Sequence, residues 1–182
     1  MKKILLWLTP LLLIASEGDY EYKIALEYTS GGRGAHEETR ELPSCPYERC
    51  EGMIEVKIVK KDYKKAIEWF NKAIEYKNKE ASLEAFKLLY KQIDYKSEEP
   101  DKYLLAKMQE NFGFGLREYN KLIALYLNDM AQNQQCLGYF HSYEAYKHGY
   151  FGYNVSNEKA EKYKNLAHET CPENSIYFLL SK

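Results

Sequence analysis

The feature that most constrains this chain is the stretch from Cys136 to Cys171, which contains two helical segments with a cysteine at each outer end. A glycine turn at residues 149–152 separates the segments. Two helices joined by a turn return antiparallel, so a cysteine early in the first can face one late in the second. Closing this loop of about 35 residues would stabilise the fold by roughly 3–4 kcal/mol. We therefore predict a helix pair closed by a disulfide.

A metal site is the alternative role for these sulfur atoms. His168 and Cys171 stand three apart, and Cys136 would be a third ligand. Structural zinc sites use four ligands, usually as two closely spaced pairs. Because the second pair is missing, the disulfide is favoured, and we expect neither a metal nor another cofactor.

Parts of this helix pair recur upstream. Tyr-x-x-Gly-x-x-Gly occurs at residues 28–34 and 146–152, and Lys-Ala-x-x-aromatic-x-x-x-Ala occurs at residues 65–73 and 159–167. The first glycine suits a left-handed residue that ends a helix. Alanines seven apart lie on one helix face, where they let a neighbouring helix approach closely. Two copies of each motif predict a protein built from helical repeats.

Residues 62–73 and the glycine turn before them resemble a Sel-one-like repeat, the close relative of the tetratricopeptide repeat. Cys136 and Cys171 resemble the cysteines of its secreted branch, in which a disulfide joins each helix pair, although here each lies about a turn further out. The resemblance covers residues 60–90 and 136–171. It implies an all-α fold, a disulfide-stapled α-solenoid of antiparallel helix pairs in a superhelix, that binds proteins and has no shared chemistry.

Residues 1–18 are typical of a secretory signal peptide, with two lysines before an apolar run at residues 4–15. The run is too short to span a bilayer and Pro10 interrupts it, so we expect no stable membrane anchor. We expect a bacterial protein that is periplasmic or secreted. Residues 19–182 would form a single helical-repeat domain.

The net charge of the chain indicates which class of molecule it can bind. The chain has 26 basic and 27 acidic residues; removing residues 1–18 takes away two lysines and one glutamate, leaving 24 and 26, a net charge of −2. Proteins that bind nucleic acid instead present a clustered basic surface. We therefore expect no nucleic-acid partner.

All four cysteines follow residue 18, and an even number in an oxidising compartment favours two disulfides. Four cysteines allow three connectivities. If Cys136 pairs with Cys171, then Cys45 and Cys50 remain, and they would close a small loop in an irregular segment at residues 33–58. A redox-active pair is disfavoured, because the spacing is not Cys-x-x-Cys.

Residues 53–59 support two interpretations. Their alternation of apolar and polar side chains is typical of a strand. The repeat register instead requires a helix there, and no partner strand is evident, so we expect a helix. Overall we expect a right-handed superhelical stack of about seven or eight helices. The other helical segments are predicted over residues 19–28, 62–77 with Asp62 as N-cap, 81–95, 97–112, 116–131, the pair within 136–171, and 174–180.

Few residues are candidates for chemistry. His141 and His148 share a helix face without a nearby third ligand, and residues 36–38 (His-Glu-Glu) lack the second histidine of a zinc motif. No Gly-x-Ser-x-Gly elbow is present, and no serine or cysteine stands in a recognisable nucleophile–base motif with a histidine. We expect no enzymatic activity.

The chain is unusually rich in tyrosine, with 18 residues. Exposed tyrosine provides a large, stiff contact area with a hydrogen-bonding tip, which suits a protein-binding surface. The alternative is that these rings only pack between neighbouring repeats. Six aromatic residues crowd one helix and its turn, more than one face can bury, and we predict that they bind a partner: Tyr139, Tyr143, Tyr146, Tyr150, Phe151 and Tyr153.

Together these features predict a non-enzymatic exported module that binds proteins through a rigid helical-repeat surface. A small exported repeat protein of this kind fits an immunity protein that neutralises a secreted bacterial toxin. A general periplasmic scaffold or adaptor is the alternative within the same class. An enzyme acting on cell-wall material is the alternative from another class, and the missing nucleophile–base arrangement argues against it.

Overall fold

The structure, a computed structural model, describes residues 18–33, 40–41, 56–92 and 100–172. These residues form seven α-helices, one short 3-10 helix and three short strands. The strands are β1 (Gly32–Arg33), β2 (Arg40–Glu41) and β3 (Val56–Val59), and the 3-10 helix is η1 (Tyr150–Gly152). The α-helices are α1 (Asp19–Ser30), α2 (Tyr63–Glu75), α3 (Ala81–Tyr90), α4 (Pro100–Phe112), α5 (Leu116–Gln132), α6 (Cys136–His148) and α7 (Asn157–Thr170).

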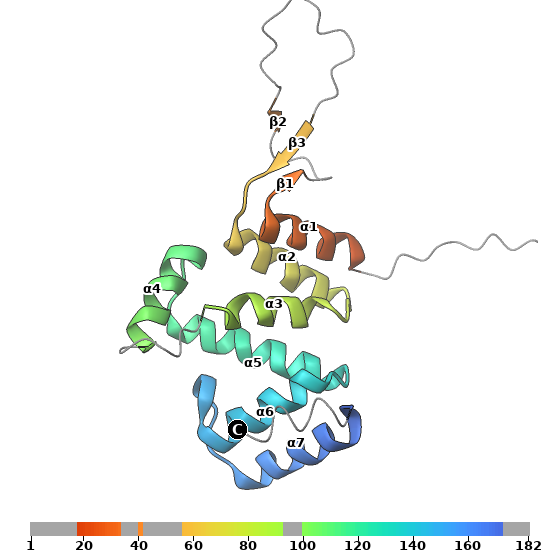
Figure 1. Cartoon of the computed structure of the whole chain (residues 1–182), viewed down its shortest axis with the longest axis vertical. Helices are drawn as coiled ribbons and strands as arrows, with labels where there is room; N and C mark the ends of the chain where they lie inside the picture. The colour runs from red at the N-terminus through yellow and green to blue at the C-terminus, as the bar shows by residue number, and fades with distance from the viewer. Residues whose placement is uncertain (1–17, 34–39, 42–55, 93–99, 173–182) are drawn as a thin grey trace, which may run out of the picture.

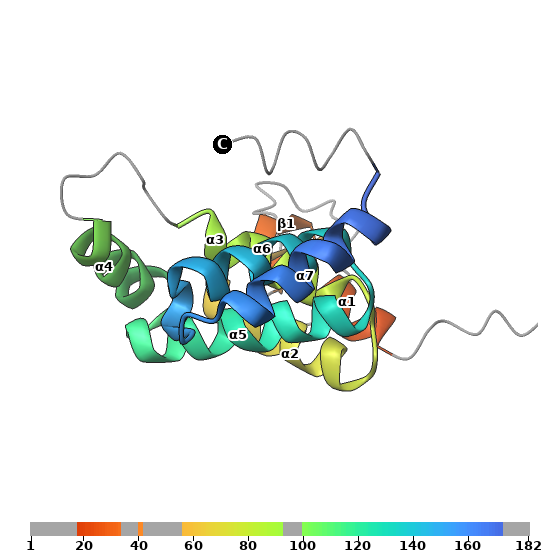
Figure 2. The same cartoon turned by 90° about the horizontal axis from the view of Figure 1, so that it is seen from below.

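Six of the helices form one stack, in the order α1, α2, α3, α5, α6 and α7 along the long axis (Figure 1). Each helix packs against the next one in this order. Helix α4 stands beside the stack in both views (Figures 1 and 2) and contacts α2 and α5. This order of contacts confirms the predicted packing of neighbouring helices in pairs. None of the described helices is long and apolar enough to cross a membrane.

The helix ends follow from the residues that the repeated motifs contain. Asp62 caps α2, its carboxylate accepting a hydrogen bond from the Lys65 amide at 3.0 Å, which confirms the predicted N-cap. Ser156 caps α7 in the same way at 3.4 Å. Gly31 ends α1 and Gly149 ends α6, with φ of 69° and 74°, a region that favours glycine.

One hydrogen bond recurs in the α1–α2 and α6–α7 pairs. The Asp62 amide donates to the Tyr28 carbonyl at 3.0 Å, and the Ser156 amide donates to the Tyr146 carbonyl at 2.9 Å. The lysine three residues after each cap places its Nζ over the same tyrosine ring, at 5.2 Å in the first pair and 5.0 Å in the last. The repeated motifs thus fold into the same local geometry, with the two helices of each pair antiparallel.

The connectors inside these two pairs differ in length. Thirty residues separate Gly31 from Asp62, whereas six separate Gly149 from Ser156. The longer connector contains the sheet, whose strand order is β1-β3-β2 with both pairings antiparallel. Gly32 lies opposite Val59, and the sheet projects beyond the α1 end of the stack (Figure 1).

The prediction of a helix over residues 53–59 is therefore wrong for the part that the structure describes. Val56–Val59 is a strand, as its alternation indicated. Its partners are the two-residue strands β1 and β2, whose residues carry no strand pattern of their own. The fold is helical, as predicted, with the addition of a small sheet at one end. The expectation of a wholly irregular segment at residues 33–58 is corrected for the part that the structure describes.

The core follows the predicted helix faces. Ala66 and Ala73 on α2 are fully buried, and Ala160 and Ala167 on α7 are nearly so, which lets neighbouring helices approach closely. The central helix α5, which matches the helix predicted over residues 116–131, buries five large side chains on one face. Its buried side chains are Tyr119, Ile123, Tyr126, Leu127 and Met130.

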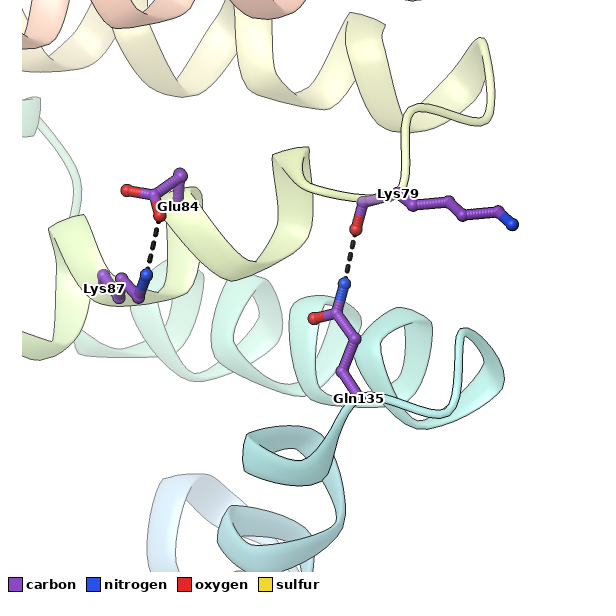
Figure 3. Close-up of polar contacts among 4 residues, drawn as sticks. All are labelled: Lys79, Glu84, Lys87 and Gln135. Atoms are coloured by element: carbon purple, nitrogen blue, oxygen red, sulfur yellow. Dashed lines mark hydrogen bonds and ion pairs between the residues drawn. The ribbon is translucent and has the colours of Figure 1, made fainter. Parts of the chain in front are cut away.

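The turns that connect one pair to the next also match each other. The Asn78 amide donates to the Ala73 carbonyl, and the Gln135 amide donates to the Met130 carbonyl, both at 2.9 Å. The residue before each donor, Lys77 or Gln134, adopts a positive φ of 63° or 56°. Figure 3 shows that the two turns touch, because the Gln135 side chain donates to the Lys79 carbonyl.

Several predictions lie outside the described residues. They concern residues 1–17 of the signal peptide, the pairing of Cys45 with Cys50, the histidine at position 36 and the closing helix at residues 174–180. These stay predictions.

Candidate functional site

The predicted disulfide between Cys136 and Cys171 is present. Its Sγ atoms lie 2.03 Å apart and its Cα atoms 5.1 Å apart. It ties the start of α6 to the end of α7, beside the buried side chains of Tyr139 and Ala167. The described residues contain no group of three or more His, Cys, Asp or Glu side chains that could hold a metal ion.

Of the six predicted binding aromatics, two are buried, three are partly buried and one is exposed. Tyr139 and Tyr143 are 6% and 8% exposed. The Tyr146 ring stacks on Tyr163 of α7, with 5.6 Å between centroids, and meets Tyr153 edge-on at 4.8 Å. These rings join α6 to α7.

The turn after α6 supplies the remaining members. Phe151 lies edge-on to Tyr119 of α5 and Tyr90 of α3, at 6.4 and 6.5 Å, so η1 closes against the stack. Tyr150 is 50% exposed and stacks on the half-exposed ring of His148. The alternative role, packing between neighbouring helices, therefore describes the cluster except for Tyr150, and partner binding by these residues stays a prediction.

Two tyrosines at this cluster, Tyr153 and its neighbour Tyr163, are weaker acids than an exposed tyrosine. Burial, with Tyr146 and Tyr163 close by, raises the pKa of Tyr153 to about 12. Burial likewise raises the pKa of Tyr163. These groups are neutral at physiological pH, where they serve as packing surface with a hydrogen-bonding tip.

The two histidines on α6 do not come together as a ligand pair. His141 packs between Phe86, Tyr90 and Phe140, with ring centroids 4.7, 5.0 and 5.2 Å away. Burial lowers the pKa of His141 to about 4, so this ring is neutral. His148 instead lies 3.6 Å from the Glu144 carboxylate at the surface.

A groove that the sequence did not predict lies between α4, the start of α2 and the end of α3. Its volume is about 820 Å³, in the range of ligand and peptide sites. It is lined by Lys61, Asp62, Tyr63, Lys91, Gln92, Tyr103, Lys107, Glu110 and Asn111.

Helix α4 is held in place by contacts on both sides of this groove. Its Phe112 is 1% exposed and stacks on Tyr63 of α2, with centroids 5.7 Å apart. The Asn111 amide donates to the Gln92 side chain just after α3, at 3.0 Å. The groove walls are therefore fixed in the unbound protein.

The groove has an excess of positive charge. Three lysines face two carboxylates, and both carboxylates are engaged: Asp62 caps α2, and Glu110 pairs with Lys107 at 2.9 Å. The Lys61 Nζ lies over the Tyr63 ring at 4.6 Å. Within the part of the chain that the structure describes, Lys61 and Lys91 have no carboxylate partner.

Sequence reasoning missed this groove because its walls come from three separate segments. The only sequence signals were lysines and tyrosines at α4 and near Asp62, which are common on helix surfaces. The groove offers ammonium and phenol groups but no nucleophile paired with a base.

Comparison of the chain with family models, with curated proteins and with solved structures finds no match.

Proposed function

We propose that this chain is an exported, non-enzymatic module that binds a protein partner through a rigid helical-repeat surface. The observation that carries the proposal is the cap geometry shared by the α1–α2 and α6–α7 pairs, down to the lysine over the tyrosine ring. The matching turns after α2 and α5 extend the equivalence to the middle of the stack.

These equivalences support a solenoid of three successive helix pairs, α1–α2, α3–α5 and α6–α7. The sheet and α4 are then insertions in the connectors of the first and second pairs. In a solenoid each pair contacts its neighbours, and the stacked pairs create an extended binding surface. Buried alanines and the disulfide make that surface stiff, so little conformational entropy is lost on binding.

The Cys136–Cys171 disulfide supports export, because disulfides persist in oxidising compartments such as the periplasm. The proposed partner is a secreted bacterial toxin, which the chain would occlude as an immunity protein. The small size of the chain and its lack of a nucleophile–base pair among the described residues favour occlusion over catalysis.

Affinity capture from periplasmic extract with the tagged full chain tests this proposal. We expect one partner in a 1:1 complex, measured by size-exclusion chromatography with light scattering. Capture of several unrelated proteins at low occupancy would favour a scaffold or adaptor instead. Turnover of cell-wall fragments by the purified chain would overturn the proposal.

A further inference from the structure

Both insertions into the stack occur at the same edge. The sheet lies in the connector between α1 and α2, and α4 lies in the connector between α3 and α5. Insertions in repeat proteins map to one face, often the face that binds. The groove lies at this edge, because α4 forms one wall and Lys61 and Asp62, which follow the sheet in the chain, belong to the opposite wall. Its position alone marks this edge as a candidate binding face.

The chemistry of the groove selects the kind of partner. Lys61 and Lys91 provide ammonium groups without an ion-pair partner among the described residues. Tyr103 is 39% exposed and offers ring surface to a bound chain. Asp62 and Glu110 stand in the same walls and would repel the continuous phosphate backbone of a nucleic acid. A peptide, in contrast, can place its carboxylates at the two lysines and neutral residues beside the acids.

We propose that this groove binds an acidic segment of the partner protein, with Lys61 and Lys91 pairing its carboxylates. The volume of about 820 Å³ accommodates a few residues in extended form. The Tyr63 ring stabilises the position of Lys61, whose Nζ already lies over it before the partner arrives. This inference rests on the proposed function and defines the chemistry of the partner.

The test uses the full chain and two fluorescein-labelled peptides measured by anisotropy. One peptide carries six glutamates between glycine and serine residues, and the other carries glutamines at the same positions. The groove variant is Lys61→Gln/Lys91→Gln. The matched control, Lys79→Gln/Lys162→Gln, removes the same charge elsewhere: Lys79 lies in the α2–α3 turn at the opposite end of these helices, with its side chain pointing away from the stack (Figure 3), and Lys162 lies on α7.

We expect the wild type and the control to bind the glutamate peptide, and the groove variant to bind at least about tenfold more weakly. The glutamine peptide should not bind. Equal weakening in both variants would overturn the proposal, because general charge attraction would explain it. Saturable binding of an oligonucleotide at the groove with equal affinity would also overturn it. Circular dichroism of both variants checks that they remain folded.

Affinity capture with the same variants separates this inference from the proposed function. Retention of the partner by the groove variant overturns the groove assignment and leaves the proposed function standing. Capture of no partner by the wild type counts against the proposed function, whereas the peptide measurement still reports on the groove.

Discussion

The first and last helix pairs share their caps but differ at both ends of the pair. At the end of the first pair that lies opposite its connector, the Asn78 side chain donates to the Asp19 carboxylate at 2.8 Å. At the corresponding end of the last pair, a disulfide joins Cys136 to Cys171. At the connector end, the first pair carries the inserted sheet and the last pair a short turn with η1.

This comparison teaches that the packing of a pair depends on its caps and small residues rather than on how its ends are joined. Loop-closure entropy grows slowly with length, so a connector of 30 residues in place of six is tolerated. A hydrogen bond and a disulfide serve the same position because both bring the start of one helix to the end of the other. The disulfide and the hydrogen bond should contribute different amounts to the free energy of unfolding. The following experiments measure these two contributions and those of nearby side chains.

The largest expected effect comes from the covalent closure of the last pair. Cys136→Ser/Cys171→Ser should lower the free energy of unfolding by about 3–4 kcal/mol, because the unfolded chain regains the entropy of an open loop. Urea denaturation followed by circular dichroism measures this loss. Cys45→Ser/Cys50→Ser is the comparison variant: the pair predicted from the sequence would close only a short loop, so the expected loss is smaller. A loss below about 1 kcal/mol in the first variant would show that the hydrogen-bonded and disulfide-bonded ends are equivalent.

The second effect concerns His141, which packs at the joint between α6 and α3. Its pKa is about 4 in the folded protein and near 6.5 when unfolded, so the unfolded chain binds the proton first. Stability is therefore complete above pH 6.5 and falls as the pH drops towards 4, by up to about 3 kcal/mol.

Unfolding free energies measured from pH 7 to 5 test this, since carboxylates contribute little in that range. His141→Leu should flatten the decline between these values. His148→Gln, at the exposed end of the same helix, is the matched control for the loss of a histidine. An identical decline in His141→Leu would assign the pH dependence to other groups.

The third effect tests the hydrogen-bonded end of the first pair. Asn78 is 6% exposed, donates to Asp19 and accepts from the amides of Glu80 and Ala81 at the start of α3. Asn78→Ala should reduce the unfolding free energy by about 2 kcal/mol, because it leaves buried groups without partners. Asn78→Asp keeps the acceptor, loses the donor and places a second carboxylate beside Asp19, so its loss reports the lost hydrogen bond together with charge repulsion. Equal stability of Asn78→Asp and wild type would show that the Asn78–Asp19 hydrogen bond does not stabilise the first pair.

The smallest effect compares two tyrosines on α5, the helix between the two outer pairs. The Tyr126 hydroxyl donates to Asn71 at 2.8 Å, whereas the buried Tyr119 hydroxyl has no hydrogen-bond partner in the part of the chain described. Tyr126→Phe should destabilise the protein by about 1 kcal/mol, and Tyr119→Phe should be neutral or stabilising. Thermal unfolding of the two variants side by side measures the difference, and the reverse ranking would contradict this assignment.

Short-range signals predicted the helix pairs well. Asp62, Gly149 and the alanines of α2 act within a few residues of where they stand, so their roles could be inferred from spacing. The prediction failed at Val56–Val59, because the strands that pair with it carry no pattern and come from earlier segments. It also missed the groove, whose walls come from segments separated in the chain.

Sequence by itself determined the α-helices of the described stack, where they are capped and which two cysteines face each other at the last pair. Caps, glycine turns and alanine spacing act through local backbone geometry, which the residues themselves specify. Tertiary structure alone decided that Phe151 and Tyr153 pack inward while Tyr150 stays exposed, that β3 finds partners, and that α4 stands off the stack. Burial and pairing depend on which distant surfaces meet, and that follows from packing the whole chain rather than from the pattern of any one segment.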